Sequence, residues 1–157
     1  MKTPSRTWYI VADGGRARFL RKRSPPRSFA APHQMFATHR DFVSAHIHDR
    51  SSDLGAERPG RSHESAGAVR HGVEPREDLH RTDKRNFVDE VAVALNDANA
   101  ADEFDRLILV APAHALSELR QALDAPTQRK IAGELQKDLT HVPEADLAEH
   151  LADVDGA

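Results

Sequence analysis

The sequence contains no cysteine, so it excludes disulfides, thiolate zinc sites and a cysteine nucleophile. Aromatic residues are scarce at 5%, and we expect the rings of Trp8 and Phe19 to fill the core rather than to stack on bases. No apolar run reaches the length of a membrane helix or of a secretory signal core. These absences predict a cytoplasmic protein without membrane insertion. A length of 157 residues predicts one domain over residues 1–157.

Charge is unevenly distributed along the chain. Residues 1–27 hold eight Lys/Arg against one acid, a net charge of +7, whereas residues 87–157 hold five Lys/Arg against fifteen Asp/Glu, a net charge of −10. A basic amino-terminal part favours an anionic partner such as RNA, because phosphate contacts supply most sequence-independent affinity. Pairing of the two ends with each other is the alternative.

The amino-terminal pattern predicts a β-hairpin. The apolar stretch from Trp8 to Ala12 runs into Asp-Gly-Gly-Arg and returns as a second strand. Gly14 and Gly15 are expected to supply positive φ angles at the turn, and Asp13 is expected to bond the backbone ahead of it. Arg16 and Arg18 should lie on one face of the return strand, opposite Phe19.

Residues 51–81 are rich in Gly, Arg and His and lack apolar periodicity, so we expect a long loop there. Before it, residues 28–38 could supply a third strand and residues 40–48 a short helix. Together with Arg16 and Arg18, the following loop residues are candidates for contact with RNA: Arg58, Arg61, His63, Arg70 and Arg76. A surface loop whose arginines pair with its own glutamates is the alternative.

The second half follows an α/β pattern. Residues 82–100 have apolar positions at helical spacing, and Leu107–Ala111 has the continuous apolar run of a strand buried on both faces. A helix should follow Pro112, and His114 could cap it. Residues 130–139 fit a helix or a strand, and Gly133 favours the strand. Another helix is expected after Pro143.

These segments resemble one known family. Four segments occur in the order seen in the bacterial host-attachment family, described as proteins required for attachment to host cells. They are WYIVADGGRARFL, DLGAERPGRSHESAG, FDRLILVAPAHALSELRQAL and GELQKDLTHVP. That family is similar to the middle domain of archaeo-eukaryotic peptide-chain release factors. The resemblance implies a three-layer α/β/α domain with a mixed sheet opened by an antiparallel hairpin.

The sequence departs from the release factors at the residues that carry their chemistry. Their long loop has a Gly-Gly-Gln motif that promotes hydrolysis of peptidyl-tRNA, whereas Arg58 to Ser65 here reads RPGRSHES. A Ser-His-Glu triad is not expected from three adjacent residues. The pair His46 and His48 lacks the accompanying spacing of a metal site. We therefore expect a non-enzymatic protein with no cofactor and no metal.

Two functions are consistent with the sequence. One is a non-catalytic module that contacts rRNA, tRNA or the ribosome through the basic hairpin and loop. The other is a regulatory or scaffolding protein that affects attachment to host cells through a protein partner, with its acidic carboxyl-terminal half as the interaction surface.

Overall fold

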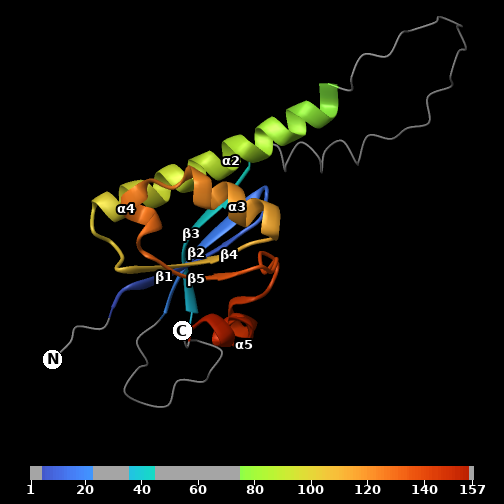
Figure 1. Ribbon diagram of the computed structural model, residues 1–157. Helices are drawn as coiled ribbons and strands as arrows, with labels where there is room; N and C mark the ends of the chain where they lie inside the picture. The colour runs from blue at the N-terminus through green and yellow to red at the C-terminus, as the bar shows by residue number, and fades with distance from the viewer. Residues whose placement is uncertain (1–4, 23–35, 45–74, 156–157) are drawn as a thin grey trace, which may run out of the picture.

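The computed structural model describes residues 5–22, 36–44 and 75–155 (Figure 1). The elements in chain order are β1 (Thr7–Ala12), β2 (Arg16–Lys22), β3 (Phe36–Val43), α2 (Pro75–Ala100), β4 (Arg106–Val110), α3 (Ala113–Ala122), α4 (Ala125–Gln128), β5 (Ile131–Leu135) and α5 (Glu144–Asp155). Within these described segments, no helix combines the length and apolar character that a bilayer crossing requires.

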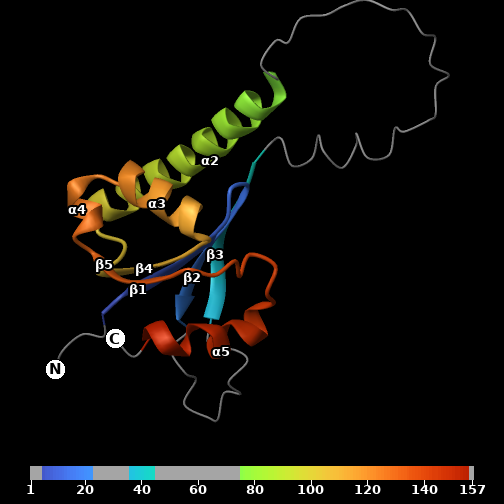
Figure 2. The same cartoon turned by 45° about the vertical axis from the view of Figure 1, so that its right-hand side comes forward.

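The strands form one mixed sheet in the order β3-β2-β1-β4-β5. β1 pairs with β2, and β2 with β3, in antiparallel fashion, whereas β4 runs parallel to both β1 and β5. The helices α2, α3 and α4 cover one face of this sheet and α5 covers the other (Figure 2). The open three-layer α/β fold with an amino-terminal hairpin is therefore confirmed.

Both faces of the central strands are buried, and alternate residues serve the two layers. Trp8 and Ile10 of β1 pack beneath α2 and α3, while Tyr9 and Val11 pack against the α5 side. β4 repeats this alternation, with Leu109 on the first face and Ile108 on the second. This arrangement explains why both strands read as continuous apolar runs.

The longest helix, α2, packs through a stripe of apolar residues. Phe87, Val91 and Leu95 recur at four-residue spacing, and each is at most 3% exposed. The helix begins at Pro75, whereas its start was expected near Thr82. The reason is that proline is favoured at a first helical position, and the acids Glu77 and Asp78 follow it in the sequence after one arginine. Both features are typical of a helix start.

α5 lies close against β5 at Gly133. A Cβ atom added to Gly133 would come 2.7 Å from Cγ1 of Val154 on α5 and 3.3 Å from Cδ1 of Ile108 on β4. Because glycine has no side chain, the end of α5 can pack directly against the sheet at this position. Assignment of this segment to a strand is confirmed.

The two outer strands each contain one irregular position. Phe19 pairs with Arg40 and Leu20 with Thr38, which leaves His39 of β3 without a partner on β2. In β5, Ala132 is left over in the same way. β3 spans Phe36–Val43, so the described part of the region expected as a helix over 40–48 is strand up to Val43. Residues 45–48 lie outside the described segments.

Candidate nucleic-acid interface

The turn between β1 and β2 is organised by the side chain of Asp13. Its Oδ1 accepts hydrogen bonds from the backbone N–H groups of Gly15 and Arg16, both at 2.7 Å, and Asp13 N donates to the Arg16 carbonyl at 2.8 Å. The expected turn role of Asp13 is confirmed. The expected positive φ angles are wrong, because no glycine in the described segments has one.

Gly14 has a different role, since it lets α2 cross the hairpin. A Cβ atom at Gly14 would lie 3.1 Å from Cδ of Lys84, so the aliphatic stem of Lys84 rests on the turn. Ser44, at the end of β3, donates its N–H to the Gly15 carbonyl at 2.8 Å. We call this region, formed by Asp13–Arg16, Ser44 and Lys84, the hairpin end.

The segment between β5 and α5 also reaches the hairpin end. Oγ1 of Thr140 lies 3.0 Å from Asp13 Oδ2 and 2.6 Å from Asp138 Oδ1. A hydroxyl has one proton to donate, and the shorter distance favours Asp138 as its acceptor. Thr140 is 6% exposed, so these contacts fix the segment against the turn. They serve architecture and leave no open coordination site.

Arg18 was a candidate for contact with RNA, and the structure shows its guanidinium engaged within the protein. Nη1 donates to the Val142 carbonyl at 2.6 Å, and Nη2 lies 3.4 Å from Thr38 Oγ1 and 3.9 Å from a carboxylate oxygen of Glu144. Arg18 thus ties β2 to the start of α5. Only a supporting role at an interface remains open to it.

Other cations near this end have no such partners in the described part of the chain. Arg16 is exposed at the start of β2, and Arg81, Lys84 and Arg85 are exposed on α2. Among the described residues, none of these four forms an ion pair. Sequence reasoning missed the role of Lys84, because its contact with Gly14 depends on how α2 crosses the hairpin.

The remaining candidates are placed less fully. Arg58, Arg61, His63 and Arg70 lie outside the described segments, and Arg76 is in the first turn of α2. His114 is the second residue of α3, with an 86% exposed side chain 3.4 Å from Glu118. The residue in the cap position is Pro112, so the expectation that His114 caps this helix is wrong.

Space for a small-molecule substrate is lacking next to Asp13. The cavity there holds about 10 Å³, which is about the room for one water molecule. Apolar side chains from α2 and α3 line most of it, including Phe87, Val91 and Leu119. Within the described segments, no group of three or more His, Asp or Glu side chains is arranged to hold a metal. Among the described residues, the hairpin end therefore offers an exposed basic surface.

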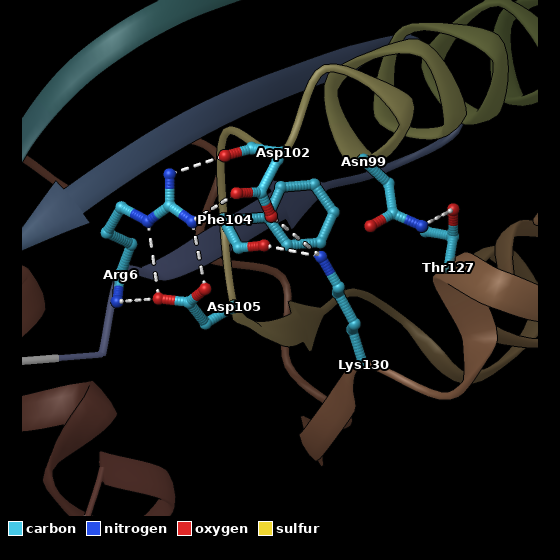
Figure 3. A network of polar contacts seen from close by, with 7 residues as sticks. All are labelled: Arg6, Asn99, Asp102, Phe104, Asp105, Thr127 and Lys130. Carbon is cyan, nitrogen blue, oxygen red and sulfur yellow. Dashed lines mark hydrogen bonds and ion pairs between the residues drawn. The ribbon is translucent and has the colours of Figure 1, made fainter.

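The opposite end of the sheet is fixed by ion pairs (Figure 3). Arg6, just before β1, forms two side-chain hydrogen bonds with Asp105, at 2.9 and 3.3 Å, and a contact of 3.1 Å with Asp102. The hydrogen bonds from Arg6 lower the pKa of Asp105 to about 2. Lys130 adds a bond of 2.7 Å to the Phe104 carbonyl. Because Arg6 and Lys130 both bind partners within the protein, this end of the sheet has a structural role.

A family model described as "Protein required for attachment to host cells" matches residues 8–151. The chain belongs to this family. The resemblance expected from the sequence is therefore confirmed for the greater part of the chain. No curated protein matches the chain.

The solved structures that match the chain include an archaeal protein. An archaeal translation termination factor, aRF1, matches with a TM-score of 0.46 and 11% sequence identity. The match covers 96% of this chain and 36% of the termination factor, so the host-attachment protein spans about a third of that factor's length.

Proposed function

We propose that this host-attachment family member is a non-catalytic module that contacts RNA, on the ribosome or free, through its hairpin end. The observation that carries the proposal is the presence, beside the turn, of exposed cations that form no ion pair within the described segments. Arg16 and Lys84 approach the hairpin from β2 and from α2, and neither is neutralised by a carboxylate of the described segments. Phosphate groups are the ligands that such a surface attracts most strongly.

The proposal also includes the candidate arginines of the long segment. Ser44, the last described residue before that segment, is bonded to the turn at Gly15. We propose that Arg58, Arg61, His63, Arg70 and Arg76 add phosphate contacts to those of Arg16 and Lys84. Hydrolysis of peptidyl-tRNA is not part of the proposal, because the sequence has no Gly-Gly-Gln motif.

Co-sedimentation with ribosomes and separated subunits, over a salt series, tests this function. Nuclease-treated wild-type protein should bind saturably at low salt and be released as salt rises. Arg16→Ala/Lys84→Ala and Arg58→Ala/Arg61→Ala should each bind more weakly. Each double variant should also lower the slope of log K against log salt by about 1.4, if each cation meets one phosphate of single-stranded RNA.

Arg129→Ala is the matched control, since this exposed arginine lies next to Lys130 at the opposite end of the sheet. The control should bind as the wild type does. Absence of binding at every salt concentration would refute the proposal, as would equal losses in the control and the hairpin variants.

A second candidate function, regulation or scaffolding through a protein partner, is favoured by a different surface. Asp89, Glu90 and Asp97 of α2 are exposed, and Val93 among them is 57% exposed. A basic protein segment would suit this face. Capture of one partner from nuclease-treated lysate, lost in Asp89→Lys/Asp97→Lys but kept in Arg16→Ala/Lys84→Ala, would support this candidate over RNA binding.

A further inference from the structure

One ridge of α2 carries opposite charges at its two ends. Residues four apart form a ridge that turns by about 40° around the helix axis at each step, and one such ridge of α2 consists of Arg81, Arg85, Asp89, Val93 and Asp97. All five are exposed. The order of charges along this ridge is two cations, an acid, an apolar residue and an acid. We call it the α2 ridge.

The charges of the α2 ridge are not paired within the described segments. Arg81, Arg85, Asp89 and Asp97 form no ion pair with other residues of the described segments. Arg85 and Asp89 are four residues apart, but a cation before an acid is the less favourable order for pairing along a helix. The ridge also includes Val93, one of the two large apolar residues that are clearly exposed in the described segments.

We propose that the α2 ridge is a self-association surface that binds a second copy of this chain with its α2 antiparallel. A two-fold axis midway between Arg85 and Asp89 places Arg85 of each copy opposite Asp89 of its partner. The same rotation places Arg81 opposite Val93, whereas Asp97 is level with position 77 of the partner and has no complementary charge there. A parallel arrangement would instead set cations against cations, so charge selects the antiparallel dimer.

The dimer is weak and sensitive to salt. Stable complexes bury about 800 Å² on each partner, and the ridge of a single helix offers less. Charge pairs at an exposed contact are screened as ionic strength rises. The inference does not depend on the proposed RNA contact, which uses the hairpin end and not the α2 ridge.

Sedimentation equilibrium on nuclease-treated protein tests the proposal with a charge swap. At low salt and high protein concentration, the mass should rise from 17.4 kDa toward twice that value, and it should return to 17.4 kDa at high salt. Arg81→Glu/Arg85→Glu and Asp89→Lys/Asp97→Lys should each remain monomeric. An equimolar mixture of the two variants should form heterodimers, because one ridge is then acidic and the other basic.

Cross-linking gives a second readout at the proposed axis. The chain has no cysteine, so Asn86→Cys, at an exposed position beside the axis, introduces a single thiol. With oxidised glutathione as the oxidant, it should form covalent dimers faster than Ser117→Cys, an exposed position on α3. Circular dichroism establishes that every variant is folded.

Three outcomes would overturn the proposal. They are a wild-type protein that stays monomeric at low salt, a dimer that survives both charge reversals, and a mixture of the variants that fails to associate. An RNA-binding result at the hairpin end would change none of these outcomes, so the two proposals fail separately.

Discussion

The contact between Gly133 and α5 predicts a coupled pair of substitutions. Gly133→Ala places a methyl group 2.7 Å from Val154 Cγ1, a distance that requires atoms to move. Overpacking of this kind costs about 1 to 3 kcal/mol. The substitution also gains about 0.4 to 1 kcal/mol, because alanine restricts the unfolded chain more than glycine does. We therefore expect a net loss of about 1 to 2 kcal/mol in the free energy of unfolding.

Val154→Ala should relieve the clash while creating a cost of its own. Val154 is 7% exposed, and removal of its two buried methyl groups costs about 0.8 kcal/mol each. If the two changes were independent, the double variant would lose the sum of both. We expect instead that the new methyl group at position 133 occupies space vacated at position 154. The coupling energy should then be about 1 kcal/mol in favour of the double variant.

Urea denaturation of the wild type, both single variants and the double variant measures this coupling. Each 1 kcal/mol should appear as a shift of about 2 to 4 °C in a parallel thermal melt. Gly133→Ala combined with Val93→Ala is the control, since Val93 is exposed on α2. Additivity within about 0.5 kcal/mol for the Gly133 and Val154 pair would refute the packing described for α5.

Two more predictions concern the hairpin and β3. Asp13→Ala removes the acceptor for the N–H groups of Gly15 and Arg16. Urea denaturation should therefore show a loss of about 2 kcal/mol in the free energy of unfolding. Asp13→Asn should lose less, because it keeps an acceptor oxygen. Burial and the nearby Arg21 lower the pKa of His39 from its usual 6.5. Protonation of His39 therefore favours the unfolded chain, and the free energy of unfolding should fall as the pH drops below about 6.5. His39→Gln should reduce this fall in urea melts at stepped pH, and an unchanged pH profile would contradict the assignment.

Patterns that act over a few residues could be predicted from the sequence. The apolar runs of β1 and β4 indicated strands, and glycine at position 133 indicated β5 rather than a helix. Pro143 correctly marked the start of α5. The start of α2 was placed too late, because polar residues in its first turns hide the helical period.

Properties that depend on contacts distant in the sequence could not be predicted. The guanidinium of Arg18 binds the segment before α5, more than a hundred residues away, and no local pattern marks that partner. The positive φ angles expected at the hairpin are absent because the Asp13 carboxylate closes the turn in their place. The contact of Lys84 with Gly14 likewise depends on the path of α2. For the interface, the types of residue could therefore be predicted from the sequence. Which of their side chains are already bound within the protein could not.

The unpaired residues of the outer strands have a consequence for aggregation of the protein. A straight outer strand exposes a row of free backbone groups that can template growth of a fibril. Here His39 interrupts the regular pairing of β3, and Ala132 interrupts that of β5. Neither edge strand therefore offers an uninterrupted row of backbone hydrogen-bonding groups to another chain. The sheet formed by the described strands thus resists fibril-like extension at either border.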